Sequence, residues 1–594
     1  MRPRKKASCA GAAVAVLMVA CAGGCQQAGA PYHRPLKPVA DRLVSAYPDL
    51  SSGRFLIIAD FEAVEQGAIF RISPSTAAAY VGLVTERARP ETGAGALKVR
   101  LTSSEQELVV EDAGQGSWTL PRDWSRFHLL LISVYSPRPV SGLTFRARSG
   151  VEKPAEFQRG GMILREGWNL IRIDLGDLSE RIDVSDVRQL RLGFSALSEP
   201  IEIYLDDIVL TDNAQDVLGS PQGQPGDLYV RSEGRRLRVG VVERFELVFA
   251  RGQIVGWFDL HNDPDRLHNL TGGGPLGPLP VVLEQAGGVL TGADEAAGWE
   301  ALGPAAETFQ RLVEATPVRA VIWGERRFGS ATASAPSEQS PLHRWVYTVY
   351  PTGKVYIEFG GTLSLPGFVP SVGYLVACAD GEGFDRVLHP ATGEPDDRNA
   401  ESAAYVLYRR PEDSRPDMLV GFYRPAAAPK VKGVRHGRDP RLGSLFFGGD
   451  VEPVTVWAAL LNVWPPDVDG PAQAEAILLD YMNPLPLTVT AGRLVRTDAG
   501  DFDNDGYNES RGHYTLEPDG AVLKLRLDGT RRMRFAPAFK VVDTSDADVW
   551  AYVDGLEIRP VARDAEGQAV FQVPDVIDRE TLIEVTARKR AAAK

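Results

Sequence analysis

The chain has 594 residues, a hydrophobic content of 44% and a formal net charge of −13. This length predicts three or four domains with packed cores. The acidic balance, without a basic cluster beyond the first residues, argues against a nucleic-acid partner. Of the 4 cysteines, only Cys378 lies beyond residue 25, so we expect no internal disulfide and stability from cores and metal sites.

The first twenty residues are typical of a secretory signal peptide (1–20). Basic residues at positions 2, 4, 5 and 6 precede an uncharged apolar run over 10–20, which is too short for a membrane span. The stretch Leu17-Met-Val-Ala-Cys21 resembles a bacterial lipobox, and this resemblance implies lipidation of Cys21, with Cys25 as the alternative. We therefore expect an exported, membrane-anchored lipoprotein, periplasmic or on the cell surface, with a linker over 21–53.

A first domain is predicted over 54–213. Short runs with alternating, β-branched residues recur at 55–62, 96–101, 127–135, 168–175 and 201–210, and this spacing favours a β-sandwich. The Asp-Phe-Glu at 60–62, the Trp-Asn-Leu-Ile-Arg-Ile-Asp-Leu at 168–175 and the Tyr-Leu-Asp-Asp-Ile-Val-Leu at 204–210 resemble a galactose-binding-like jelly roll of the carbohydrate-binding-module type.

That resemblance implies a sugar-binding domain in which the first and last strands share a structural calcium ion. It nominates Glu62 and Asp207 as ligands, with Asp60 as a further candidate; the alternative is that these carboxylates only flank strands. Because flat aromatic rings bury the apolar faces of sugars, we consider three aromatic residues as stacking candidates, against the alternative that they are core: Trp118, Trp124 and Tyr135.

A large antiparallel region is predicted over 228–490, after a Gly- and Pro-bearing linker. Its runs include 237–249, 254–261, 344–350 and 354–359, and the turn around Gly353 is typical of a hairpin. In pattern alone the region is similar to the two-sheet super-sandwich domains of polysaccharide lyases and galactose-mutarotase-like proteins.

The segment 257–269 collects histidines, aspartates and an arginine at a predicted strand exit. A lyase needs a base, a group that neutralises the uronate carboxylate and a proton donor. His261 or His268 could be the base, Asn269 or Arg266 the neutralising group and Tyr350 the donor. The alternative interpretation is a polar loop whose residues cap turns, and a glycoside hydrolase also stays open.

The segment 491–531 is predicted to be a hairpin region with a calcium loop. Side chains at Asp501, Asp503, Asp505 and Glu509, with the carbonyl of Tyr507, supply oxygens around one glycine, as a hard cation requires. Position 12 of an EF-hand would be Glu but is glycine here, so the loop resembles the shorter calcium loops of extracellular β-rich proteins. An acidic hairpin turn without metal is the alternative.

A small immunoglobulin-sized sandwich is predicted over 532–594. The fold class is therefore all-β, with tandem β-sandwiches. We predict an exported, lipid-anchored carbohydrate-binding protein whose partners are polysaccharide and, through the lipid, a membrane, and whose cofactor is calcium. A polysaccharide lyase or related enzyme in the middle region is one alternative, and a structural cell-surface protein is another.

Overall fold

The computed structural model describes most of the chain beyond residue 52. The described residues are 41, 43–45, 50, 53–86, 95–111, 119–151, 154–271, 276–286, 289–294, 305–328, 342–362, 371–379, 386–388, 405–409, 417–422, 431–436, 442–449, 454–464, 477, 480, 481, 484–544, 547–574 and 576–589. The predicted signal peptide, Cys21, Cys25 and Trp118 lie outside them. Strands make up nearly all of the regular structure, which confirms the all-β prediction.

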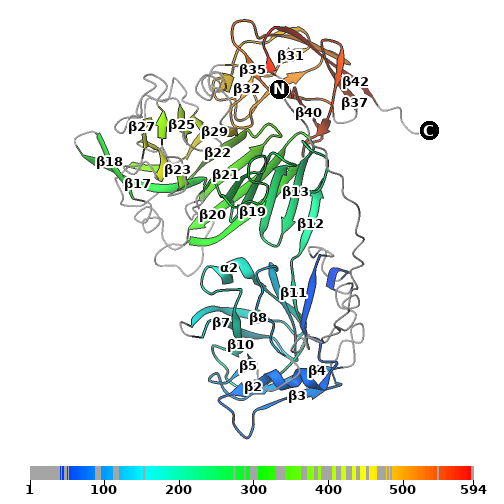
Figure 1. The fold of residues 1–594 in the computed structure, drawn as a ribbon, viewed down its shortest axis with the longest axis vertical. Helices are drawn as coiled ribbons and strands as arrows, with labels where there is room; N and C mark the ends of the chain where they lie inside the picture. Colours follow the sequence, from blue (N-terminus) through cyan, green and yellow to red (C-terminus); the bar gives the residue numbers. More distant parts are fainter. Residues whose placement is uncertain are drawn as a thin grey trace, which may run out of the picture. The chain divides into compact units, whose positions relative to one another are not determined.

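The chain forms two compact units (Figure 1). The first contains residues 55–126 and 130–210, and the second contains 211–594 with the short segments 47–54 and 127–129. Within the described part of the chain, no helix is both long and apolar enough to cross a membrane.

The first unit consists of two β-sheets. Sheet A has the order β3 (Tyr80–Val84), β4 (Ala96–Leu101), β11 (Ile201–Thr211), β6 (Leu129–Ser136) and β9 (Gly167–Asp174), and β1 (Phe55–Ala59) also pairs with β11. Sheet B has the order β2 (Phe70–Ser73), β5 (Glu107–Glu111), β10 (Val187–Phe194), β7 (Val140–Ser149) and β8 (Ala155–Leu164). Two short helices, η1 (Val64–Ile69) and α2 (Leu175–Ser179), lie in the connections.

The strand order identifies this unit as a jelly roll. From β4 to β11, the eight strands are divided between the sheets in the orders β4-β11-β6-β9 and β5-β10-β7-β8, the arrangement of two linked Greek keys. Successive side chains of a strand point to opposite faces of its sheet. On β4, Leu97 and Val99 are buried while Arg100 is exposed. The jelly-roll expectation for the first domain therefore agrees with the topology.

The second unit begins with three antiparallel sheets. Sheet C contains β12 (Ala214–Leu218), β13 (Leu228–Glu233), β14 (Arg236–Val241), β15 (Phe245–Ala250) and β16 (Gln253–Asp259). Sheet D has the order β18 (Val289–Asp294), β17 (Pro278–Ala286), β23 (Ser371–Ala379), β28 (Leu442–Gly449) and β27 (Val431–His436). Sheet E has the order β19 (Ala305–Ala315), β20 (Ala320–Phe328), β21 (Leu342–Val349), β22 (Val355–Thr362), β29 (Val454–Trp464), β26 (Asp417–Phe422), β25 (Tyr405–Arg409) and β24 (Arg386–Leu388).

The hairpin predicted around Gly353 is present between β21 and β22. The Gly353 amide donates to the carbonyl of Tyr350 at 3.0 Å, and the Tyr350 amide donates to the carbonyl of Lys354 at 2.9 Å. The two strands pair in register from Val349 opposite Val355. This hairpin carries two buried tyrosines, Tyr350 and Tyr356.

The C-terminal sandwich is larger than predicted. Sheet F has the order β30 (Thr488–Ala491), β34 (Val522–Asp528), β42 (Glu580–Lys589), β37 (Ala547–Val553) and β38 (Leu556–Ile558). Sheet G has the order β31 (Arg493–Leu494), β33 (His513–Glu517), β36 (Ala538–Val541), β40 (Ala569–Gln572) and β39 (Val561–Arg563), with β32 (Tyr507–Asn508) beside β33. A two-stranded ribbon joins β35 (Arg534–Phe535) to β41 (Val576–Ile577).

The predicted boundary at residue 532 is therefore wrong. Both sheets combine strands from before and after that position, because β34 pairs with β42 and β33 pairs with β36. The segment 491–531 is part of the sandwich, and the acidic loop at 501–509 runs from the connection after β31 to Glu509, directly after β32.

Candidate metal centre and carbohydrate-binding faces

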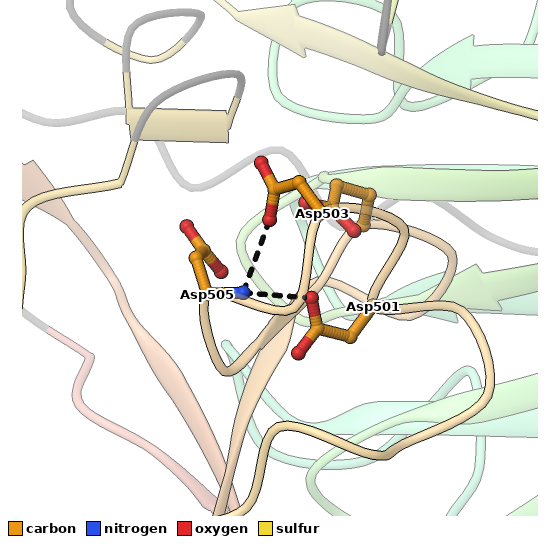
Figure 2. A group of neighbouring side chains, drawn as sticks. Asp501, Asp503 and Asp505 are labelled. Atoms are coloured by element: carbon orange, nitrogen blue, oxygen red, sulfur yellow. Dashed lines mark hydrogen bonds between the residues drawn. The ribbon is translucent and has the colours of Figure 1, made fainter. Parts of the chain in front are cut away.

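Four carboxylates converge beside the loop that follows β31. Three belong to aspartates between β31 and β32, and the fourth belongs to Glu509, directly after β32. One oxygen from each of Asp501, Asp503, Asp505 and Glu509 lies within 4.8 Å of the others. Figure 2 shows the three aspartates. The turn depends on Gly506, which has a φ of +97° and whose added Cβ would lie 2.3 Å from Cγ of Leu494. A side chain at this position would therefore be strained and would also collide with β31.

Backbone amides hold the carboxylates in place. The Asp505 amide donates to Oδ1 of Asp501 and to Oδ1 of Asp503, both at 3.1 Å (Figure 2). The Gly506 amide donates to Oδ2 of Asp501 at 2.9 Å, and the Tyr507 amide donates to Oδ1 of Asp505 at 2.7 Å. The loop is thus folded around its own carboxylates.

Glu509 supplies an independent sign of a cation. Its side chain is 0% exposed, and Oε2 accepts a hydrogen bond from the Phe502 amide at 2.9 Å. Among the described residues, Oε1 has no hydrogen-bond partner. A buried carboxylate oxygen without a donor is costly, and a cation among the four carboxylates would satisfy it.

The pKa values in the loop point the same way. Burial raises the pKa of Glu509 to about 8 and that of Asp505 to about 6, and it also raises the pKa of Asp501. The like charges of Asp503 and Asp501 add to the shift at Asp505. Carboxylates crowded in this way favour either protons or a bound cation, and an all-oxygen ligand set is suited to a hard divalent ion.

The second predicted metal site, in the jelly roll, stays a prediction. Asp60 and Asp207 are buried, and Asp207 has a φ of +46°. Oδ1 of Asp60 accepts from Nε2 of Gln66 at 2.7 Å, and Oε1 of Glu62 accepts from the Gly95 amide at 2.8 Å. Within the described segments, only the loop at 501–509 brings three or more such ligands together.

The predicted stacking residues have different surroundings. Trp124 is 0% exposed and its Nε1 donates to the carbonyl of Pro121 at 2.7 Å, so the prediction that it stacks on a sugar is wrong. Tyr135 on β6 is partly exposed and makes edge contacts with Trp168 and Tyr204, with ring centroids 5.6 and 5.9 Å apart. Sequence reasoning missed Trp168, although its position on an alternating strand was visible.

Sheet B carries a continuous row of polar side chains on its outer face. The row, here called the polar ladder, comprises Arg71, Glu111, Gln189, Arg191, Glu107 and Arg146. Nε of Arg71 donates to Oε1 of Glu111 at 2.8 Å, Gln189 also donates to Glu111, and Nε of Arg191 donates to Gln189 at 2.7 Å.

Glu107 completes the polar ladder by joining two arginines. Its carboxylate lies 3.3 Å from Nη1 of Arg191 and 3.2 Å from Nη1 of Arg146. The side chains of Arg146 and Arg191 are 34% and 33% exposed, so they lie along the sheet with one side open to solvent. Sequence reasoning missed the ladder because it depends on which strands are neighbours.

One predicted catalytic role is contradicted. Tyr350 is 1% exposed, and its hydroxyl donates to the carbonyl of Arg511 at 2.9 Å. A buried hydroxyl with this partner cannot reach a polysaccharide, so the prediction that Tyr350 is a proton donor is wrong.

The other predicted catalytic residues hold their own loop together. Arg266 pairs with buried Glu246 through Nε at 2.8 Å. Asn269 accepts from the Trp257 amide at 3.0 Å and donates to the carbonyl of Val255 at 3.0 Å.

The two histidines of this segment differ in exposure. His261 is exposed, and His268 is half-buried with its amide bonded to Asp263 at 2.7 Å. These contacts favour the polar-loop interpretation of the segment, and the roles of His261 and His268 as bases stay predictions.

Comparison with known proteins gives limited results. No model of a protein family matches the chain, and no curated protein matches it. Similar solved structures include a family 11 carbohydrate-binding module from Clostridium thermocellum in complex with a β-1,3-1,4-mixed-linked tetrasaccharide, at 14% identity and a TM-score of 0.21, over 27% of this chain and 97% of that chain.

Two further structures show similar values. The family 30 carbohydrate-binding module of a cellulosomal cellulase of Clostridium thermocellum has 12% identity and a TM-score of 0.21, over 27% of this chain and 97% of that chain. An exo-β-agarase has 15% identity and a TM-score of 0.22, over 26% of this chain and 24% of its own.

Proposed function

We propose that the protein binds carbohydrate through the outer face of sheet B in its jelly roll. The polar ladder carries this proposal. Planar guanidinium, amide and carboxylate groups lie side by side across four strands, and they are already fixed by their mutual hydrogen bonds.

This arrangement suits a ligand made of hydroxyl groups. Each arginine has five N–H donors, of which the ladder uses only a part, while carboxylates and amides accept hydrogen bonds. Nε of Arg146 is buried and has no hydrogen-bond acceptor among the described residues, although it lies 4.0 Å from Oε1 of Glu156. Because the side chains are held in place before binding, little further conformational entropy is lost when a sugar chain binds.

The test is affinity electrophoresis of the full-length protein on a panel of neutral and acidic polysaccharides. We expect Arg146→Ala and Arg191→Ala each to weaken binding by about tenfold or more, since a hydrogen bond to a charged group contributes about 1.5–3 kcal/mol. Arg138→Ala is the matched control, because Arg138 is exposed and pairs with Glu199 away from the ladder.

A further variant locates the binding face. If Trp168→Ala abolishes retention and the ladder variants do not, the sugar binds over Tyr135 and Trp168 on sheet A instead. If the wild-type protein is retained on none of the polysaccharides, the carbohydrate proposal is wrong.

We also propose that the loop at 501–509 binds calcium. The buried Oε1 of Glu509 has no hydrogen-bond partner among the described residues, and the Glu509 carboxylate lies in one cluster with three aspartates; both observations support this assignment. Among biological hard cations, Ca²⁺ tolerates a flexible set of carboxylates and a backbone carbonyl, whereas Mg²⁺ demands near-octahedral geometry and retains its waters. Isothermal titration with CaCl₂ and MgCl₂ tests this proposal, and stronger binding of Mg²⁺ would contradict it.

Export and lipid anchoring are proposed from the sequence of the first 25 residues. Fractionation of cells that express the natural chain should find the protein with membranes, and Cys21→Ser should release it. Release by Cys25→Ser alone would instead identify Cys25 as the lipid site.

A further inference from the structure

Residues 507–512, which follow the three aspartates of the acidic loop, also form the surface through which the C-terminal sandwich contacts the β21–β22 hairpin. The Tyr350 hydroxyl donates to the carbonyl of Arg511 at 2.9 Å, and Nη1 of Arg511 donates to Oγ1 of Thr348 at 3.4 Å. The hydroxyls of Tyr507 and Tyr356 lie 3.2 Å apart. Residues 507–512 therefore belong both to the loop and to the contact.

At Gly512 the backbone packs so closely against Tyr356 that the C-terminal sandwich and the β21–β22 hairpin cannot move independently there. Gly512 has a φ of +72°, and a Cβ added there would lie 2.1 Å from Cζ of Tyr356. The rings of Tyr350, Tyr356, Tyr507 and Tyr514 belong to one buried cluster with the core of the sandwich. A close-packed cluster of this kind transmits displacement because it has no free volume in which to absorb it.

The two ends of the loop are bonded to each other. The Ser510 amide donates to the carbonyl of Gly500 at 3.3 Å, and Nδ2 of Asn508 donates to the carbonyl of Ala499 at 3.0 Å. Glu509 and Ser510 are both 0% exposed. A shift of Glu509 must therefore move Ser510 and Arg511, and with them the hydrogen bonds to the hairpin.

We propose that occupancy of the metal loop controls how firmly the C-terminal sandwich docks on the β21–β22 hairpin. This inference rests on the proposed metal site. Without a cation, the ionised carboxylates among these four groups repel one another across 4.8 Å or less, and the loop opens by displacing Glu509. A divalent cation removes the repulsion, fixes residues 507–512 and so fixes the hairpin that they touch.

Hydrogen–deuterium exchange of the full-length protein, with CaCl₂ or with EGTA, tests the coupling. At a calcium concentration of 100 times Kd, exchange should slow by about a hundredfold. The decisive amides are those of Gly512, bonded to the carbonyl of Asn508 at 2.7 Å, and of Tyr350, bonded to the carbonyl of Lys354 at 2.9 Å. Slower exchange in the hairpin 348–356 supports the inference, and slower exchange confined to 498–510 overturns it.

Terbium luminescence measures binding separately from docking. Tb³⁺ binding without hairpin protection would overturn the coupling and leave the metal proposal intact, whereas no binding would overturn both. Asp503→Asn should abolish binding and protection together, while Asp519→Asn, at an exposed carboxylate of the same sandwich, should change neither.

Because coupling is reciprocal, loosening the junction should weaken metal binding. Tyr350→Phe removes the hydrogen bond to Arg511 without altering a ligand, and we expect a loss of Tb³⁺ affinity of about fivefold or more. Tyr80→Phe, at an exposed tyrosine of the jelly roll, should leave the affinity unchanged. An unchanged affinity in Tyr350→Phe would overturn the inference.

Discussion

Glu509→Gln should have opposite effects on stability with and without calcium. At pH 9, above the raised pKa of about 8 of Glu509, the metal-free carboxylate is ionised. The substitution then keeps the shape of the side chain and removes one buried negative charge from a cluster of four. In EGTA the variant should be more stable than the wild type, because the metal-free wild type must hold its carboxylates together. In calcium the variant should be less stable, because it binds the ion poorly.

The magnitude follows from the spacing of the carboxylates. Two unit charges at the 4.8 Å limit of the cluster repel by about 1 kcal/mol in water and by about 3 kcal/mol at an effective dielectric constant of 20. The gain in EGTA should therefore be about 1–3 kcal/mol. At a calcium concentration of 100 times Kd, binding raises the free energy of unfolding of the wild type by about 3 kcal/mol. The variant binds the ion poorly and does not receive this stabilisation.

Differential scanning calorimetry in the two buffers measures both effects. For a domain of about 100 residues, 1 kcal/mol shifts Tm by about 4–8 °C, so the transition of the C-terminal sandwich should move measurably in each direction. Asp519→Asn is the control for loss of an acidic group. A Tm that falls equally in both buffers would refute the reasoning, since it would show that Glu509 has only a packing role.

Three other predictions concern buried groups. Burial lowers the pKa of His513 to about 4, an effect to which neighbouring Arg319 adds. The contribution of neutral His513 to the free energy of unfolding is present above pH 6.5 and is lost as pH falls towards 4, by about 3 kcal/mol in total. In His513→Asn, the free energy of unfolding measured in urea should therefore change less with pH over this range. The same pH dependence in variant and wild type would contradict this. Trp124→Ala should destabilise the jelly roll by about 3–5 kcal/mol through the cavity it leaves, without altering Tb³⁺ affinity; an unaltered jelly-roll transition in calorimetry would show that the site collapses freely. Gly512→Ala should lower the Tm of the C-terminal sandwich by several degrees, because the added methyl group meets Tyr356; a wild-type Tm would mean that the tyrosine ring moves aside at little cost.

The parts of the fold that depend on local pattern could be predicted from the sequence. The short alternating runs that form β4 and β11 indicated a β-sandwich, and the turn at Gly353 indicated a hairpin. The acidic loop was also visible, because its ligands are close in sequence and the need for Gly506 is a local backbone requirement.

The parts that depend on strand order could not be predicted. The polar ladder joins Arg71 to Arg146 across strands that are distant in sequence, and no local pattern reports which strands are neighbours. Trp124 was predicted as a stacking candidate, because the sequence around a tryptophan does not show whether other strands will cover its ring. The boundary at residue 532 was misplaced for the same reason, since β34 finds its partner β42 more than fifty residues later.

The position of β42 has a consequence for biosynthesis. In sheet F this strand lies between β34 and β37, so residues 580–589 form an interior strand. Until a translating ribosome has released them, β34 and β37 each present an unpaired edge, and such edges attract strands of other chains. Sheet F of the C-terminal sandwich therefore cannot be completed before residues 580–589 have been synthesised, and until then its two open edges favour pairing with other chains.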